Sequence, residues 1–167
     1  AAARPGAGEL AGAIAGWLVG LAPPEVAVYA EAAARGRLVF AHAGCERCHA
    51  GAPAVGREGA PGLLGLWWRA PYLRDGGLAV GTGEGIVGVG ELWARELPID
   101  PRASLRALLD RDLRARVIAA NRTDAARWQI HVRGDGHAFW VDPAAGFSPA
   151  EQQALIEFLL SLRPAGP

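Results

Sequence analysis

The sequence has no methionine, no lysine and only two cysteines. Two cysteines cannot form the framework of several disulfides that stabilises many small secreted domains. The seventeen basic residues, all arginine, are balanced by seventeen acidic residues, so charge gives no argument for a nucleic-acid partner. No apolar run reaches the length of about 20 residues that a membrane-spanning helix needs, and we therefore expect no transmembrane span.

The length and composition suit one domain with short extensions. The chain has 167 residues, of which 51% are hydrophobic, enough to build a core. The apolar residues recur mostly at helical spacing, which predicts a mostly α fold. We predict an N-terminal extension over residues 1–24, a single helical domain over residues 25–163, and a tail over residues 164–167.

The N-terminal extension contains a short apolar helix over Leu10–Ala22. Large apolar residues recur at helical spacing on one face, and glycines fall every four residues on another. A stripe of small residues lets a second backbone approach closely. Residues 8–22 are therefore a candidate docking surface for another copy or subunit; the alternative is a helix that covers its own core.

Three further helices are predicted from their boundary signals. One runs over Glu25–Ala43, with a break at Gly36. Another is capped by Asp100 and continues as one element to Asn121, which caps its end. The last begins at Ser148–Glu151, a capping box with proline at the first helical position.

Two other segments lack helical spacing. Residues 77–90 are rich in glycine, which predicts a flexible surface loop. Residues 129–141 contain β-branched residues around a Gly-Asp-Gly turn, which is typical of strands. Both segments belong to a long insertion between the two cysteines and the last helix.

The two cysteines lie in Cys45–His49, a C-x-x-C-H pentapeptide. This pattern is typical of c-type haem attachment, because each thiol adds across one haem vinyl group to form a thioether and the histidine binds the iron. We predict one covalent haem c, held by Cys45, Cys48 and His49. The alternatives are a redox-active C-x-x-C pair, which needs a βαβ context, and a zinc site, which needs about four ligands.

The second axial ligand of such an iron separates electron carriers from catalysts. Methionine is absent, which excludes a His/Met site. His137 is the first choice, because Gly136 gives the backbone room for close approach and apolar residues follow it. His131 is the second choice. Either histidine could instead be an ordinary hydrogen-bonded residue.

The chain resembles class I-like c-type cytochromes. The resemblance is carried by Gly36–Phe40, by Cys45–His49 and by Ile156–Leu162 in the last helix. It implies a cytochrome c-like helical haem domain over residues 25–163, in which Gly36 permits a close helix crossing and Phe40 packs on Phe158.

A second segment, Pro61–Gly76, is similar to the haem domains of the di-haem cytochrome c peroxidase, MauG and rubber-oxygenase group. This chain has Arg74 where those domains often have histidine, and it has one haem motif where the peroxidases have two. The similarity implies haem contacts from the tryptophans and the arginine of this segment, which hydrogen-bond propionates, and a haem-edge or distal role for a tyrosine. It also supports a distal ligand from a Gly-His-x-Phe element such as the one at His137. The residues concerned are Trp67, Trp68, Arg69 and Tyr72.

These observations lead to three functional hypotheses. The first is electron transfer through one bis-histidine haem c, with a redox partner protein or neighbouring haem subunits. The second is a peroxidase- or oxygenase-like haem enzyme with an open distal site. The third is a structural role in a complex or filament, which is compatible with the first. Covalent haem attachment implies export, so we expect a periplasmic or extracellular location.

Overall fold

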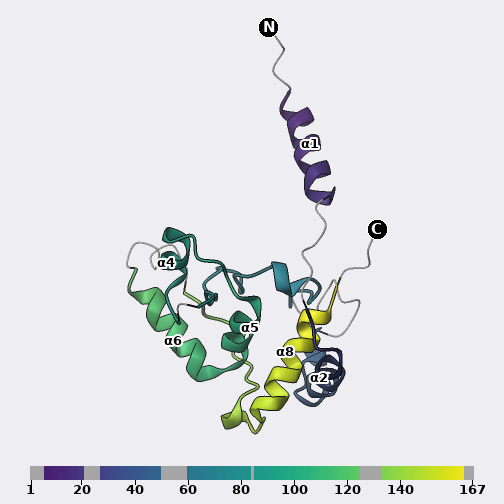
Figure 1. The fold of residues 1–167 in the computed structure, drawn as a ribbon, viewed down its shortest axis with the longest axis vertical. Helices are drawn as coiled ribbons and strands as arrows, with labels where there is room; N and C mark the ends of the chain where they lie inside the picture. The colour runs from purple at the N-terminus through teal and green to yellow at the C-terminus, as the bar shows by residue number, and fades with distance from the viewer. Residues whose placement is uncertain (1–5, 21–26, 50–59, 84, 125–132, 164–167) are drawn as a thin grey trace.

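The computed structural model describes residues 6–20, 27–49, 60–83, 85–124 and 133–163. These residues form a mostly helical fold, as predicted (Figure 1). They contain no β-strand, only isolated bridges that pair Tyr72 with Leu78 and Gly81 with Ile99. In chain order, the elements are α1 (Ala7–Gly20), α2 (Ala30–His42), α3 (Glu46–His49), η1 (Leu66–Trp68), α4 (Val89–Ala94), α5 (Pro101–Leu109), α6 (Arg111–Arg122), η2 (Pro143–Ala145) and α8 (Pro149–Ser161).

Helices α2 and α8 cross in close contact. A Cβ atom added at Gly36 would collide with the carbonyl oxygen of Ala154, so the two backbones can meet here only because residue 36 is glycine. Beside this contact, the rings of Phe40 and Phe158 pack with their centroids 5.4 Å apart. The expected close crossing is therefore present. The predicted break at Gly36 is wrong, because α2 continues through this buried glycine without interruption.

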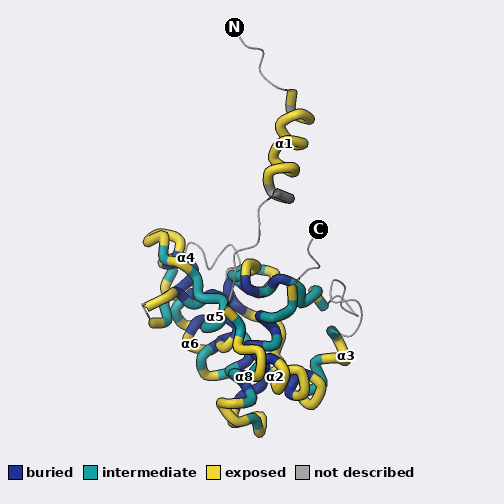
Figure 2. The backbone as a smooth tube through the Cα atoms, turned by 45° about the vertical axis from the view of Figure 1, so that its right-hand side comes forward, coloured by how far each residue is buried: buried dark blue, intermediate teal, exposed yellow. Residues whose placement is uncertain are grey.

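The hydrophobic core lies where α2, α5, α6 and α8 meet (Figure 2). It also takes in side chains from the segment after η1 and from the stretch before η2. Burial of these apolar surfaces is the main favourable contribution to folding. The buried residues of this cluster are Val39, Phe40, Trp67, Tyr72, Leu78, Leu105, Ala107, Leu109, Val117, Val141, Leu155, Ile156, Leu159 and Leu160.

The predicted helix caps are largely confirmed. Ser148 and Glu151 form the capping box at the start of α8, and Asp100 accepts hydrogen bonds from the first turn of α5. The single helix predicted after Asp100 is wrong, because Asp110 leaves the helical conformation and caps a second helix, α6. Asn121 does not cap the end of α6; its side chain bonds other segments instead.

The two segments without helical spacing differ from their predictions. Leu78 and Ala79 are completely buried, so the expectation of a flexible surface loop over residues 77–90 is wrong for this part, although Thr82 and Gly83 are exposed. The described part of the predicted strand region, residues 133–141, forms no strand ladder. Both segments pack as irregular chain, because side chains satisfy their backbone groups in place of strand partners.

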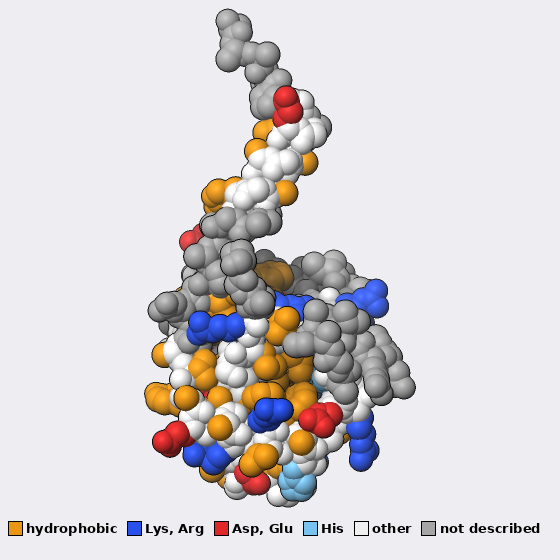
Figure 3. All heavy atoms as spheres, turned by 90° about the vertical axis from the view of Figure 1, so that its right-hand side faces the viewer, with side chains coloured by type: hydrophobic (Ala, Val, Ile, Leu, Met, Phe, Trp, Pro, Cys, Tyr) orange, Lys and Arg blue, Asp and Glu red, His pale blue; other side chains and the backbone are white. Residues whose placement is uncertain are grey.

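Helix α1 stands apart from the other described elements (Figure 1). Leu10, Ile14 and Trp17 are exposed, and Figure 3 shows this helix as mainly hydrophobic and uncharged side chains. The predicted helix is present, but it begins at Ala7, and residues 21 and 22 of the prediction lie outside the described residues. Leu10, Ile14 and Trp17 do not cover a core within the described residues. None of the described helices combines the length and the apolar character that a bilayer crossing requires.

Candidate functional site

The Cys45–His49 segment begins directly after α2. The amide of Cys45 donates to the carbonyl of Phe40 at 3.1 Å, and the amide of His49 donates to the carbonyl of Cys45 at 3.0 Å. These local bonds join the end of α2 to α3. The Cys45 side chain is partly buried against the core, while Cys48 is exposed. The helix that crosses α8 thus directly positions the pentapeptide.

The environment of Cys45 does not favour thiol redox chemistry. Burial raises the pKa of the Cys45 thiol from 9.0 to about 11. Reactive cysteines need the thiolate, which a lowered pKa provides. In the part of the chain that the structure describes, no three His, Cys, Asp or Glu side chains gather to hold a metal ion. Neither the redox-pair alternative nor the zinc alternative therefore gains support from the geometry.

The ring of His49 is oriented by a backbone carbonyl. Its Nδ1 lies 3.1 Å from the carbonyl oxygen of Pro61. A carbonyl can only accept, so Nδ1 carries a proton and donates it, and in the neutral imidazole the lone pair is then on Nε2. Histidines that bind metals commonly donate their other ring N–H to a carbonyl or carboxylate in this way. His49 is therefore held in the tautomer that an axial ligand requires.

The ring of His137 lies close to the ring of His49. The centroids of the two rings are 6.2 Å apart, and their planes are inclined by 46°. A transition-metal ion lies about 2 Å from each imidazole nitrogen that binds it, so two rings on opposite sides of one ion have centroids roughly 6 Å apart. The distance between the two rings therefore fits a pair of axial ligands to one iron.

No match was found when the chain was compared with protein-family models, with curated proteins and with solved structures. The site is therefore defined by the contacts of this chain alone. The second-choice ligand, His131, lies outside the described residues and stays a prediction. Within the described residues, the ring of His137 lies close to that of His49.

The surroundings of His137 favour the neutral imidazole. Burial lowers the pKa of His137, and the nearby His49 and Arg114 lower it further. By its accessible surface, however, the His137 residue is exposed to solvent. A neutral imidazole has a free lone pair, which is the form that binds a metal. The electrostatic environment therefore favours a ligand over a cation at this position.

The tryptophan segment supplies a donor without an acceptor. Trp67 is buried, its ring contacts Trp68 edge-on, and no acceptor for its Nε1 is found among the described residues. Buried donors usually have a partner, so this N–H is available to a carboxylate of a bound group. Trp68 is partly exposed, and Arg69 donates to the carbonyl of Gly62 at 2.8 Å. The donor chemistry fits a haem propionate at Trp67 better than at Arg69.

Tyr72 packs in the hydrophobic core, and its hydroxyl bonds the backbone of η1. It is buried in the core, and its hydroxyl donates to the carbonyl of Leu66 at 2.6 Å. Burial raises the pKa of Tyr72, and the charge of Asp100 raises it further. A phenolate ligand is disfavoured under these conditions. The hydroxyl therefore fastens η1 to the core, and nothing in its contacts directs it to His49.

Side chains from distant segments hold the loop that carries His137, residues 133–140, which we call the His137 loop. The carboxylate of Asp75 accepts from the amide of Gly134 at 3.0 Å. Asn121 on α6 donates to the carbonyl of Arg133 at 3.2 Å. Arg114, on the same buried face of α6 as Asn121, donates to carbonyl groups further along the loop. These contacts anchor the loop to α6 and to the segment after Tyr72.

Sequence reasoning missed these anchoring residues. Arg114 lies in a helix rich in charged residues, yet it is only 3% exposed. The available signal was its spacing: Arg114, Val117 and Asn121 follow one another at helical intervals and share the buried face of α6. A polar residue on an apolar stripe indicates a buried partner.

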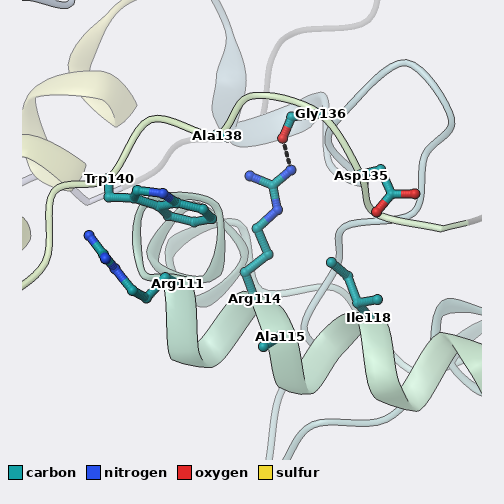
Figure 4. A pocket seen from close by; sticks show the side chains of 8 residues that line it. All are labelled: Arg111, Arg114, Ala115, Ile118, Asp135, Gly136, Ala138 and Trp140. Carbon is teal, nitrogen blue, oxygen red and sulfur yellow. Dashed lines mark hydrogen bonds between the residues drawn. The ribbon is translucent and has the colours of Figure 1, made fainter. Parts of the chain in front are cut away.

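Behind the His137 loop lies an open cavity of about 310 Å³ (Figure 4). Trp140 forms part of its wall, with the guanidinium carbons of Arg111 and Arg114 at 5.7 and 5.4 Å from its ring centroid. Arg111 also forms an ion pair with Asp142 at 2.8 Å. The cavity is lined by Arg111, Arg114, Ala115, Ile118, Asp135, Gly136, Ala138 and Trp140.

Proposed function

We propose that this protein transfers electrons through one haem c, attached covalently at Cys45 and Cys48 and ligated by His49 and His137. The observation that carries the proposal is the separation of 6.2 Å between the two imidazole centroids. The hydrogen bond from His49 Nδ1 to the carbonyl of Pro61 supports it, because it leaves Nε2 as the ring nitrogen that can bind a metal.

The arrangement favours electron transfer over catalysis. Imidazoles from His49 and His137 would fill both axial positions of a bound haem iron and would leave none for a substrate. A bound haem iron would supply a one-electron couple, with a reduction potential that depends on its ligands and its burial. The protein's part is to keep the same two ligands in place in both oxidation states, which both anchored histidines are suited to do.

The partner would be a redox protein or a neighbouring haem subunit. The net charge is zero, so long-range steering would be weak and docking would depend on shape. On the face in Figure 3, hydrophobic side chains gather between separate arginine and acidic side chains. The exposed apolar side chains of α1 are a candidate contact with another copy or subunit. Covalent haem attachment suggests an exported protein.

The test is the spectrum of the chain produced with the haem-attachment machinery. A pyridine haemochrome spectrum should report covalent haem c, and the ferric and ferrous proteins should both be low-spin, with no rapid binding of CO. Replacing His137 with alanine should give a high-spin ferric protein that binds CO when reduced, because one axial position opens.

A matched control is His42→Ala. His42 is an exposed histidine whose ring packs on Phe147 at 5.6 Å, so this variant should keep the low-spin spectrum. An unchanged spectrum for His137→Ala would reject His137 as the ligand and direct attention to His131. A high-spin wild-type protein that reacts with peroxide would instead favour the peroxidase-like hypothesis.

A further inference from the structure

The side chain of Arg114 reaches from α6 into the His137 loop (Figure 4). Nε and Nη2 each donate to the carbonyl of Gly134 at 3.1 Å, and Nη1 donates to the carbonyl of His137 at 2.9 Å. Nη2 also bonds the carbonyl of Gly136. One guanidinium therefore holds carbonyl groups of three residues in the short stretch that ends at the candidate ligand.

The backbone of this stretch has an unusual conformation. Gly134, Gly136 and His137 have φ angles of 83°, 97° and 44°, all in the left-handed region. Glycine enters that region freely, but a residue with a Cβ atom is disfavoured there. His137 therefore needs contacts that hold it, and the bond from Arg114 to its own carbonyl is one of them.

Arg114 depends on the loop in return. Its side chain is only 3% exposed. Among the described residues no carboxylate forms an ion pair with it; the Asp75 and Asp135 charges act on it only from a distance. A buried charge is costly unless it is hydrogen-bonded, so the loop carbonyls are what make its burial tolerable. The guanidinium and the His137 loop thus stabilise each other in one arrangement.

Building on the proposed haem function, we propose that Arg114 is a positioning residue that keeps His137 at the iron by clamping the carbonyls of the Gly134–His137 stretch. Its rigid planar fork can bind several carbonyls at once, which a lysine ammonium cannot do in the same geometry. Without it, the loop would relax from its left-handed conformation, and the imidazole of His137 would leave its place opposite His49.

Arg111 offers a matched control on the same helix. Its guanidinium lies over the same Trp140 ring, at 5.7 Å against 5.4 Å for Arg114. Its side chain bonds Asp142, however, and not the Gly134–His137 stretch. Replacing Arg111 therefore removes an arginine and a Trp140 contact while it leaves the clamp in place.

The experiment compares Arg114→Gln with Arg111→Gln in the full haem-loaded chain. Arg114→Gln should show a high-spin ferric fraction, and added imidazole should restore the low-spin spectrum. After reduction it should bind CO at least about tenfold faster than Arg111→Gln, because the rate follows the fraction of molecules in which His137 is detached. If Arg114→Gln does not fold, Arg114→Lys against Arg111→Lys provides the same comparison, with a smaller increase.

The result that overturns the inference is specific to it. If His137→Ala becomes high-spin but Arg114→Gln and Arg114→Lys keep the low-spin spectrum and the slow CO binding of the wild type, then Arg114 only stabilises the fold. If His137→Ala itself has an unchanged spectrum, the proposed ligand pair fails first, and the role of Arg114 toward it fails with it.

Discussion

The two histidines of the candidate site are held in place in different ways. His49 follows α2 directly, within a few residues of chain whose hydrogen bonds are local. His137 lies in a loop that the side chains of Asp75, Arg114 and Asn121 hold from distant parts of the sequence. The first depends on one helix crossing, and the second on several long-range polar contacts. The segment that carries His49 should therefore unfold only when the whole domain unfolds, whereas the His137 loop should open locally while the rest of the domain stays folded.

The largest expected effect is on the free energy of unfolding of the helices α2, α5 and α8, which support the segment that carries His49. The carboxylate of Glu157 is fully buried and bonds Arg102 at 2.8 and 3.1 Å, and it also accepts from the Tyr29 amide before α2. Glu157→Leu should lower the free energy of unfolding by about 3 kcal/mol, because it leaves the Arg102 charge without its partner. Urea unfolding would measure this.

The control for that variant is Arg106→Gln, which removes an exposed arginine that bonds Gln153. It should change the free energy of unfolding by less than about 0.5 kcal/mol. Equal losses for the two variants would show that the Glu157 network does not support the fold.

The crossing of α2 and α8 is the next test. Gly36→Ala should lower the free energy of unfolding by about 1–3 kcal/mol, because the added methyl group has to push the backbones apart. Gly12→Ala in α1 is the control, since its Cβ meets no other atom within contact range. Chemical denaturation of both variants decides it, and a stabilised Gly36→Ala protein would contradict the close crossing.

A smaller effect is expected on the local opening of the His137 loop. Asp75→Asn should weaken the bonds to the amides of Arg133 and Gly134 and lower the free energy of local opening by about 1–2 kcal/mol. Hydrogen exchange at Gly134 should then become faster, while the amides of α8 keep their protection. If the amides of α8 also exchanged faster, the His137 loop and the helices would form one cooperative unit, and the loop would not open independently.

The smallest expected effect is the pH dependence of the free energy of unfolding, to which carboxylates near both histidines should contribute. Burial is the largest single influence on Glu157 and Asp142 and would raise their pKa values. Hydrogen bonds from Arg102 and Arg111, bonds from nearby backbone amides and the guanidinium charges together outweigh it and lower both pKa values. A carboxylate with a lowered folded pKa contributes stability above its unfolded pKa, and that stability is lost as the pH falls toward the folded pKa.

The lowered pKa of His137 acts in the same direction, because the unfolded imidazole binds a proton more readily than the folded one. The free energy of unfolding should therefore begin to fall below about pH 6.5 and fall more steeply below about pH 4. Urea midpoints measured between neutral pH and about pH 3 would show it. Glu157→Leu should make the fall shallower, and a slope identical to that of the wild type would exclude this carboxylate as a source.

Much of the helical frame was predictable because its signals are local. The capping box at Ser148 and Glu151 and the cap at Asp100 depend on residues within one turn of one another. The division of the predicted long helix at Asp110 was harder to predict. Although aspartate is a preferred N-cap residue, the helical pattern continues across it, and only the folded chain shows that Asp110 caps a second helix. Likewise, the burial of Leu78 and Ala79 inside a glycine-rich stretch reflects packing that composition does not report.

The amino-acid sequence by itself determined the chemistry that is available: two thiols and a histidine in one pentapeptide, no methionine, and few other histidines. It also determined the apolar faces and caps of most helices. Only the tertiary structure shows that the ring of His137 lies near that of His49, and which side chains hold the His137 loop there. The physical reason is that caps and turns are satisfied within a few residues, whereas a buried guanidinium finds its carbonyls wherever folding brings them.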